Sequence, residues 1–168
     1  DDAIPGPKFN VYDMMQYTPD YVNFNEYRQS MTKHPLREAV VRAAEQSKGA
    51  LAQPPTRFET ANLSQRLTDA QKVAAQTRHF VDQSLTALRA VEKDRAKETS
   101  RRWQAHYDLM MGRLLASKVR CDEYNWALAQ MKVSPRTPQK KESNAWDLVG
   151  DPEIAFGKKE GAAAAAKI

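Results

Sequence analysis

The fold is decided by LSQRLTDAQKVAAQTRHFVDQSLTALRAV, residues 63–91, and WQAHYDLMMGRLLASKVRCDEYNWALAQM, residues 103–131. In each stretch, apolar or small residues recur at alternating spacings of four and three, as in a heptad seam. The first seam is Leu63, Leu67, Ala70, Ala74, Thr77, Val81, Ser84, Leu88 and Val91. The second is Trp103, Tyr107, Met110, Leu114, Ser117, Cys121, Tyr124, Leu128 and Met131. The pattern predicts two long helices, over about 62–97 and 101–132.

Folding the chain back near Thr99 places these seams opposite each other, with small residues meeting large ones. Ala74 then faces Tyr124, and Leu88 faces Met110, which allows close packing. We therefore expect an antiparallel helical hairpin. The alternative is one unbroken helix that pairs with another chain, because residues 97–101 contain neither Gly nor Pro.

A shorter helix is expected before the hairpin, over about residues 35–48. Pro35 is tolerated in its first turn, and Leu36, Val40 and Ala43 share one face. Gly49 ends the helix, and a proline-containing linker follows it. The predicted fold class is all-α, with a helical domain over residues 32–134.

The overall composition agrees with long helices and a thin core. The 168 residues hold only 6 Gly beside 9 Pro, which argues against a turn-rich β-sandwich or barrel. The formal net charge of +5 permits an acidic partner without demanding one. No run of about 18 apolar residues is present, so we expect no membrane insertion. No targeting signal is visible, and the single cysteine fits a cell-envelope or a cytoplasmic location.

Residues 1–31 are predicted to form an extended aromatic arm. They hold six of the chain's aromatic residues, at spacings that fit neither a strand nor a long helix, with three prolines among them. Such rings need a surface to bury them. We favour packing along the protein's own helices, and the alternative is docking on a partner, with Tyr17, Tyr21 and Phe24 as anchors.

Residues 135–168 are expected to form an irregular tail. Trp146 anchors a short docked segment in this interpretation, and the alanine-rich end resembles the start of a further helix. Because that helix has no cap and the chain starts without Met, we expect a fragment or a processed product of a longer protein. Trp126 on the second long helix joins Trp146 as an interaction candidate.

The sequence offers little catalytic chemistry. It contains no glycine-rich phosphate loop, no nucleophile elbow and no zinc-binding His-Glu-x-x-His helix. Cys121 lies on the seam, where a buried and inert thiol is the expected state. We expect no enzyme activity, no metal and no cofactor.

Positive charge collects on the hairpin. Residues 62–132 hold thirteen Lys and Arg against eight Asp and Glu. The bend is the most basic region, which suggests a secondary hypothesis of nucleic-acid or polyanion binding at this tip. Interspersed acids favour the plainer interpretation of a solvated helix end. The candidate residues are Lys93, Arg95, Lys97, Arg101 and Arg102.

The stretches RWQAHYDLMMGRLLA (residues 102–116), KVR (118–120), YNWA (124–127) and KKESNAWDLV (140–149) resemble one known family. They are similar to the C-terminal helical region of large bacterial proteins that contain a von Willebrand factor A-type domain. The resemblance implies a helical piece of a larger chain, with the adhesion-type domain upstream. That domain's Asp-x-Ser-x-Ser metal motif is absent here, so no metal ligand is carried over. The expected function is a non-enzymatic protein-interaction or scaffolding module whose partner is another protein or an upstream domain of the same chain, and an oligomer is a further option.

Overall fold

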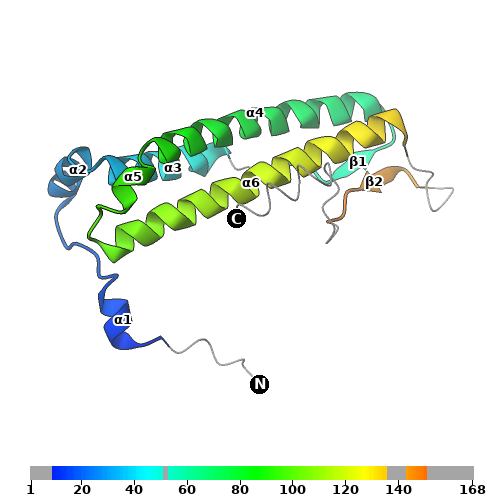
Figure 1. The fold of residues 1–168 in the computed structure, drawn as a ribbon. Coiled ribbons are helices and arrows are strands. Elements are labelled where there is room, and N and C mark those ends of the chain that lie inside the picture. Colours follow the sequence, from blue (N-terminus) through cyan, green and yellow to red (C-terminus); the bar gives the residue numbers. More distant parts are fainter. Residues whose placement is uncertain (1–8, 51–52, 136–142, 151–168) are drawn as a thin grey trace, which may run out of the picture.

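Two long antiparallel helices, α4 (Leu63–Ala90) and α6 (Arg101–Val133), form a hairpin that organises the molecule (Figure 1). The computed structural model describes residues 9–50, 53–135 and 143–150. The chain reverses between Arg95 and Arg101, so the alternative of one unbroken helix is wrong. The fold is all-α, as predicted.

The predicted seams form the hairpin core. The buried residues of α6 all lie on the predicted seam, and those of α4 do so with the addition of Leu85. Hydrogen bonds between α4 and α6 fix the register of the two helices. Arg78 Nε donates to Asp122 Oδ1 at 2.7 Å. Nearer the bend, the hydroxyl of Tyr107 donates to the carbonyl of Leu88 at 3.2 Å. These bonds agree with the alignment inferred from the sequence.

The first hairpin helix ends earlier than predicted. It stops at Ala90 rather than near Lys97, and a short helix, α5 (Glu92–Arg95), follows it. The break is stabilised by contacts from distant parts of the chain. Arg95 binds Asp108 of α6 through two bonds of 2.6 and 2.5 Å. Glu98 binds Arg37, which lies on the shorter helix before the hairpin. Local propensity alone did not reveal this early end of the helix, although the bend near Thr99 was predicted.

The bend end of the hairpin is covered by the expected shorter helix, α3 (Pro35–Ala50), which contacts both α4 and α6. Leu36, Val40 and Ala43 are buried there, as their spacing predicted. They pack in one cluster with Val81, Leu85, Leu88, Trp103, Tyr107, Met110 and Leu114. This end is therefore a three-helix core.

The open end of the hairpin uses a different cover, a two-stranded antiparallel sheet that the sequence analysis missed. Strand β1 (Arg57–Glu59) pairs with β2 (Ala145–Asp147), with Phe58 opposite Trp146. Phe58 is buried in a second cluster with Leu67, Ala70, Ala74, Tyr124 and Leu128, and Trp146 packs against it. Three-residue strands are too short for alternation to identify them. The prediction that Trp146 anchors a docked segment is confirmed.

The N-terminal arm is not simply extended. It contains α1 (Val11–Met15) and α2 (Phe24–Thr32), whose caps are Asn10 and Asn23. The Asn23 side chain accepts a bond from the Glu26 amide at 3.0 Å. Asn followed three residues later by Glu is a helix-start signal that the interrupted aromatic pattern concealed. The predicted helix near the C-terminus, residues 158–168, lies outside the described residues.

Candidate interaction surfaces

The most exposed apolar surface of the described chain is the outer arm, which we define as residues 9–24. Tyr21 is 88% exposed, Phe24 70% and Tyr17 43%. The other large apolar side chains that it exposes are Phe9, Val11, Tyr12, Met14, Met15 and Val22. The expectation that these rings pack along the protein's own helices is therefore wrong. In Figure 1, α1 stands away from the bundle.

The arm is attached to the bundle at its C-terminal end. Met31 of α2 is buried in the bend-end core, and Tyr27 packs against it. The Tyr27 ring lies 6.3 Å from the Trp103 ring, centre to centre. Burial thus changes within one short helix, from Phe24, which is exposed, to Met31, which is buried. This attachment holds the outer arm at the bend end of the hairpin.

A buried ion pair lies beside that attachment. Nε and Nη2 of Arg37 donate to the two carboxylate oxygens of Glu98, both at 2.8 Å, and the two side chains are only 11% and 5% exposed. Arg37 also lies over the Trp103 ring at 5.5 Å and within 3.8 Å of Asp20. The Glu98 carboxylate accepts a further bond from the Ser100 amide at 2.9 Å. We call this group the clasp.

The clasp shifts the ionisation of both partners. The hydrogen bond from Arg37 holds the pKa of Glu98 below its ordinary value, against the opposing effect of burial. The hydrogen bond to Glu98 raises the pKa of Arg37 in return. Both groups are therefore charged at neutral pH. The clasp links α3 to the turn before α6.

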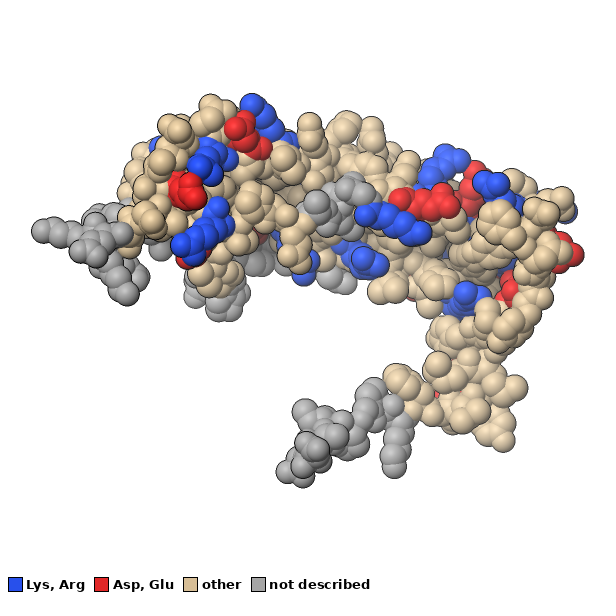
Figure 2. Space-filling model, turned by 180° about the vertical axis from the view of Figure 1, so that it is seen from behind, with Lys and Arg blue, Asp and Glu red and all other residues tan. Residues whose placement is uncertain are grey.

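The predicted basic tip is only partly available to a ligand. Arg95 is bound to Asp108, which raises the pKa of Arg95, and Lys97 lies 2.9 Å from Asp94. Lys93, Arg101 and Arg102 form no ion pair with a described residue. Figure 2 shows basic and acidic side chains interspersed over the rear face rather than gathered in one patch. Three of the five predicted cations at the bend thus have no acidic partner in the described part of the chain.

The two tryptophan candidates lie away from the outer arm. Trp146 is half-buried against the open-end core, so most of its contact is internal. Trp126 is also half-buried on α6. Neither joins Tyr17, Tyr21 and Phe24 in a common surface. Sequence reasoning also missed Val11, Tyr12, Met14 and Met15, for which the cap residue Asn10 ahead of an apolar run was the available signal.

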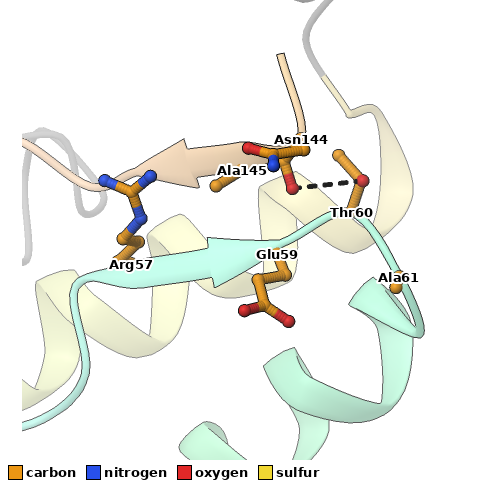
Figure 3. Close-up of a pocket in the computed structure, with 6 residues that line it drawn as sticks. All are labelled: Arg57, Glu59, Thr60, Ala61, Asn144 and Ala145. Atoms are coloured by element: carbon orange, nitrogen blue, oxygen red, sulfur yellow. Dashed lines mark hydrogen bonds between the residues drawn. The ribbon is translucent and has the colours of Figure 1, made fainter. Parts of the chain in front are cut away.

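A shallow, open pocket lies at the end of the sheet, lined by Arg57, Glu59, Thr60, Ala61, Asn144 and Ala145 (Figure 3). Its polar groups are bonded to neighbours. The Thr60 hydroxyl donates to the Asn144 carbonyl at 3.2 Å, Arg57 pairs with Asp147, and Glu59 pairs with Arg66. These contacts hold the strands to the start of α4. They place no nucleophile beside a base.

Other ionisable groups have structural surroundings. Burial raises the pKa of the half-buried Cys121 thiol, which disfavours its reactive thiolate form. Burial also raises the pKa of Tyr124 to about 12, and its hydroxyl donates to the Pro55 carbonyl at 2.6 Å. Among the described residues, no cluster of His, Cys, Asp and Glu forms a candidate metal site. No helix in the described ranges is long and apolar enough to cross a membrane.

Comparisons of the chain with protein-family models, with curated proteins and with solved structures find no match in any of the three.

Proposed function

We propose that this chain is a non-enzymatic protein-interaction module in which the helical hairpin is a rigid body that presents the outer arm to a partner. The observation that supports this most directly is the exposure of nine large apolar side chains within residues 9–24. Isolated exposed apolar residues are ordinary, but a contiguous set of this size is typical of an interaction site. The partner is another protein or another domain of the same chain, such as the adhesion-type domain that the resemblance implies.

The attachment of the arm supports the same function. A segment held at one end by the buried Met31 and by Tyr27 samples fewer positions than a free tail, so less entropy is lost when it binds. Tyr residues supply a large contact area with few rotatable bonds. The bundle thus presents aromatic groups at a defined place without burying them itself.

Site-specific photo-crosslinking tests this proposal. A photoreactive phenylalanine analogue replaces Tyr21 in one sample and Val133 in another, and the full chain is expressed in its native cells. These two sites are matched, since they are 88% and 84% exposed and lie at opposite ends of the hairpin. We expect a discrete crosslinked product only from position 21, and its loss when Tyr17 and Phe24 are changed to Ser. Equal products from both sites would contradict the proposal.

Polyanion binding through the tip is the second candidate. It is supported by Lys93, Arg101 and Arg102, which form no ion pair with any residue that the structure describes. Counterion release makes phosphate binding fall steeply with added salt, whereas an aromatic contact responds little. The triple change of these residues to Gln should then abolish retention on heparin, with Arg95→Gln as the control because Arg95 is already paired. Unchanged retention would remove this candidate.

A further inference from the structure

The helix α6 carries a second unpartnered surface beside its seam. Arg102, Leu109, Arg113, Ala116 and Arg120 recur at helical spacing along one flank, and we call this set the cationic stripe. Leu109 is 62% exposed, and Arg113 and Arg120 are also exposed. None of the three arginines forms an ion pair with a described residue. Within the described part of the chain, their guanidinium groups therefore have no acidic partner.

All three acidic side chains of α6, Asp108, Asp122 and Glu123, already have partners. Asp108 is bound to Arg95, and Asp122 is bound to Arg78 and lies near Lys118. Between Leu109 and Ala116 stands Gly112, where an added methyl group would meet no atom within 4 Å. The stripe thus combines positive charge with a shallow apolar stretch that has small side chains.

The outer arm has the complementary chemistry. It carries Asp13 and Asp20 and no basic residue among its apolar side chains. Asp13 forms no ion pair with a described residue, whereas Asp20 lies beside Arg37. In a single copy the outer arm stays exposed, and so do Leu109, Arg113 and Arg120 of the stripe, so the described part of the arm does not cover them. The structure therefore contains two matching surfaces that one copy leaves apart.

The dimensions of the two surfaces also agree. The stripe from Arg102 to Arg120 is about 27 Å long at 1.5 Å per residue. The amides of Tyr17 and Thr18 donate turn bonds back to α1. With these bonds opened, the eight residues between α1 and α2 can extend to about 26 Å, and α1 adds about 8 Å. The five aromatic side chains of the outer arm can bury about 150–250 Å² each, which approaches the roughly 800 Å² per partner of a stable complex.

We infer that the outer arm docks on the cationic stripe of a second copy of this chain, so that two copies exchange arms in a symmetric dimer. This inference rests on the proposed interaction function of the arm. Exchange forms the same contact twice, which is a common route to dimers. Asp20 lies 3.8 Å from Arg37 of α3, and α1 stands off the bundle in Figure 1.

Sedimentation equilibrium of the full chain at up to about 1 mM tests the inference over micromolar dissociation constants. We expect a species of twice the 19.0 kDa monomer mass. Reversing the charge of the stripe with Arg113→Glu and Arg120→Glu should raise the dissociation constant at least about tenfold, and so should reversing the charge of the arm with Asp13→Arg. Combining both reversals in one chain should restore much of the affinity. Arg89→Glu is the matched control, at an exposed arginine of α4 that forms no ion pair among the described residues.

The outcomes separate this inference from the function on which it rests. A monomer at every concentration, or a dimer that neither reversal weakens, would overturn self-association through the stripe. If the monomer still forms the position-21 crosslink to another protein, the arm remains an interaction site and only its assigned partner is wrong. If that crosslink is also absent, both proposals fail. Circular dichroism confirms that the exposed charge changes leave the helices intact.

Discussion

The seam between α4 and α6 and the outer arm are both rich in large apolar side chains, yet one is buried and the other exposed. Seam residues such as Leu67, Val81 and Leu88 are 0% exposed. In the seam, a spacing of four and three keeps every apolar residue on one helix face, so two helices can bury them together. The outer arm lacks that repeat and contains Pro19, so no single face collects its rings. Spacing rather than hydrophobicity therefore separates core from interaction surface.

The largest contrast between the two regions should come from placing a charge in each. Leu88→Asp puts an unpaired carboxylate in the bend-end core and should lower the free energy of unfolding by at least about 4 kcal/mol. Tyr21→Asp, at an 88% exposed side chain, should change it by less than about 0.5 kcal/mol. Urea unfolding followed by circular dichroism measures both. A stable Leu88→Asp variant would mean that the seam is wrongly assigned.

Breaking the clasp should have the next largest effect on stability. It allows a buried ion pair to be compared with an exposed one. Arg37→Ala leaves the Glu98 carboxylate buried without its partner, which should cost about 3 kcal/mol of unfolding free energy. Arg95→Ala breaks a pair whose side chains are 41% and 50% exposed, so it should cost at most about 1 kcal/mol. The same urea titration compares them. Equal losses would show that the clasp does not hold the turn together.

The clasp also predicts a pH dependence. Because Arg37 lowers the pKa of Glu98 in the folded state, the unfolded chain binds that proton more readily. Its stabilisation is complete above the ordinary pKa of Glu, about 4.3, and is lost as the pH falls through the lower folded value. Glu98→Gln should therefore reduce the loss of stability between about pH 6 and pH 2.5. Glu45→Gln, at an exposed glutamate, should leave the acid loss unchanged.

The hairpin was predictable because its pattern is long. Two seams of nine positions each specify both the helices and their alignment, and the bond between Arg78 and Asp122 agrees with that alignment. The shorter helix at Pro35 was predictable for a similar reason, since Leu36, Val40 and Ala43 share one face. Patterns that extend over several helical turns are the most informative.

Features that are short, or that depend on contacts between distant residues, were not predictable. The bend near Thr99 was predicted, but the earlier end of α4 at Ala90 was not. Arg95 meets Asp108 there, and Glu98 meets Arg37, which is 61 residues away. No local residue marks this helix end. The candidate site was predictable in part: Tyr17, Tyr21 and Phe24 were identified from their residue types. Their exposure could not be deduced, because burial depends on what the bundle leaves uncovered.

Substitutions in the outer arm should have the smallest effect on stability. They therefore test binding separately from folding. Changing Tyr12, Tyr17 and Phe24 together to Ser removes three exposed rings from the arm. Each exposed change should alter unfolding by no more than about 0.5 kcal/mol, so the melting curve should barely move. The crosslink from position 21 should nevertheless disappear, because aromatic side chains provide most of the energy in many interfaces. Loss of stability together with binding would instead mean that these rings support the bundle, and the arm would then belong to the fold.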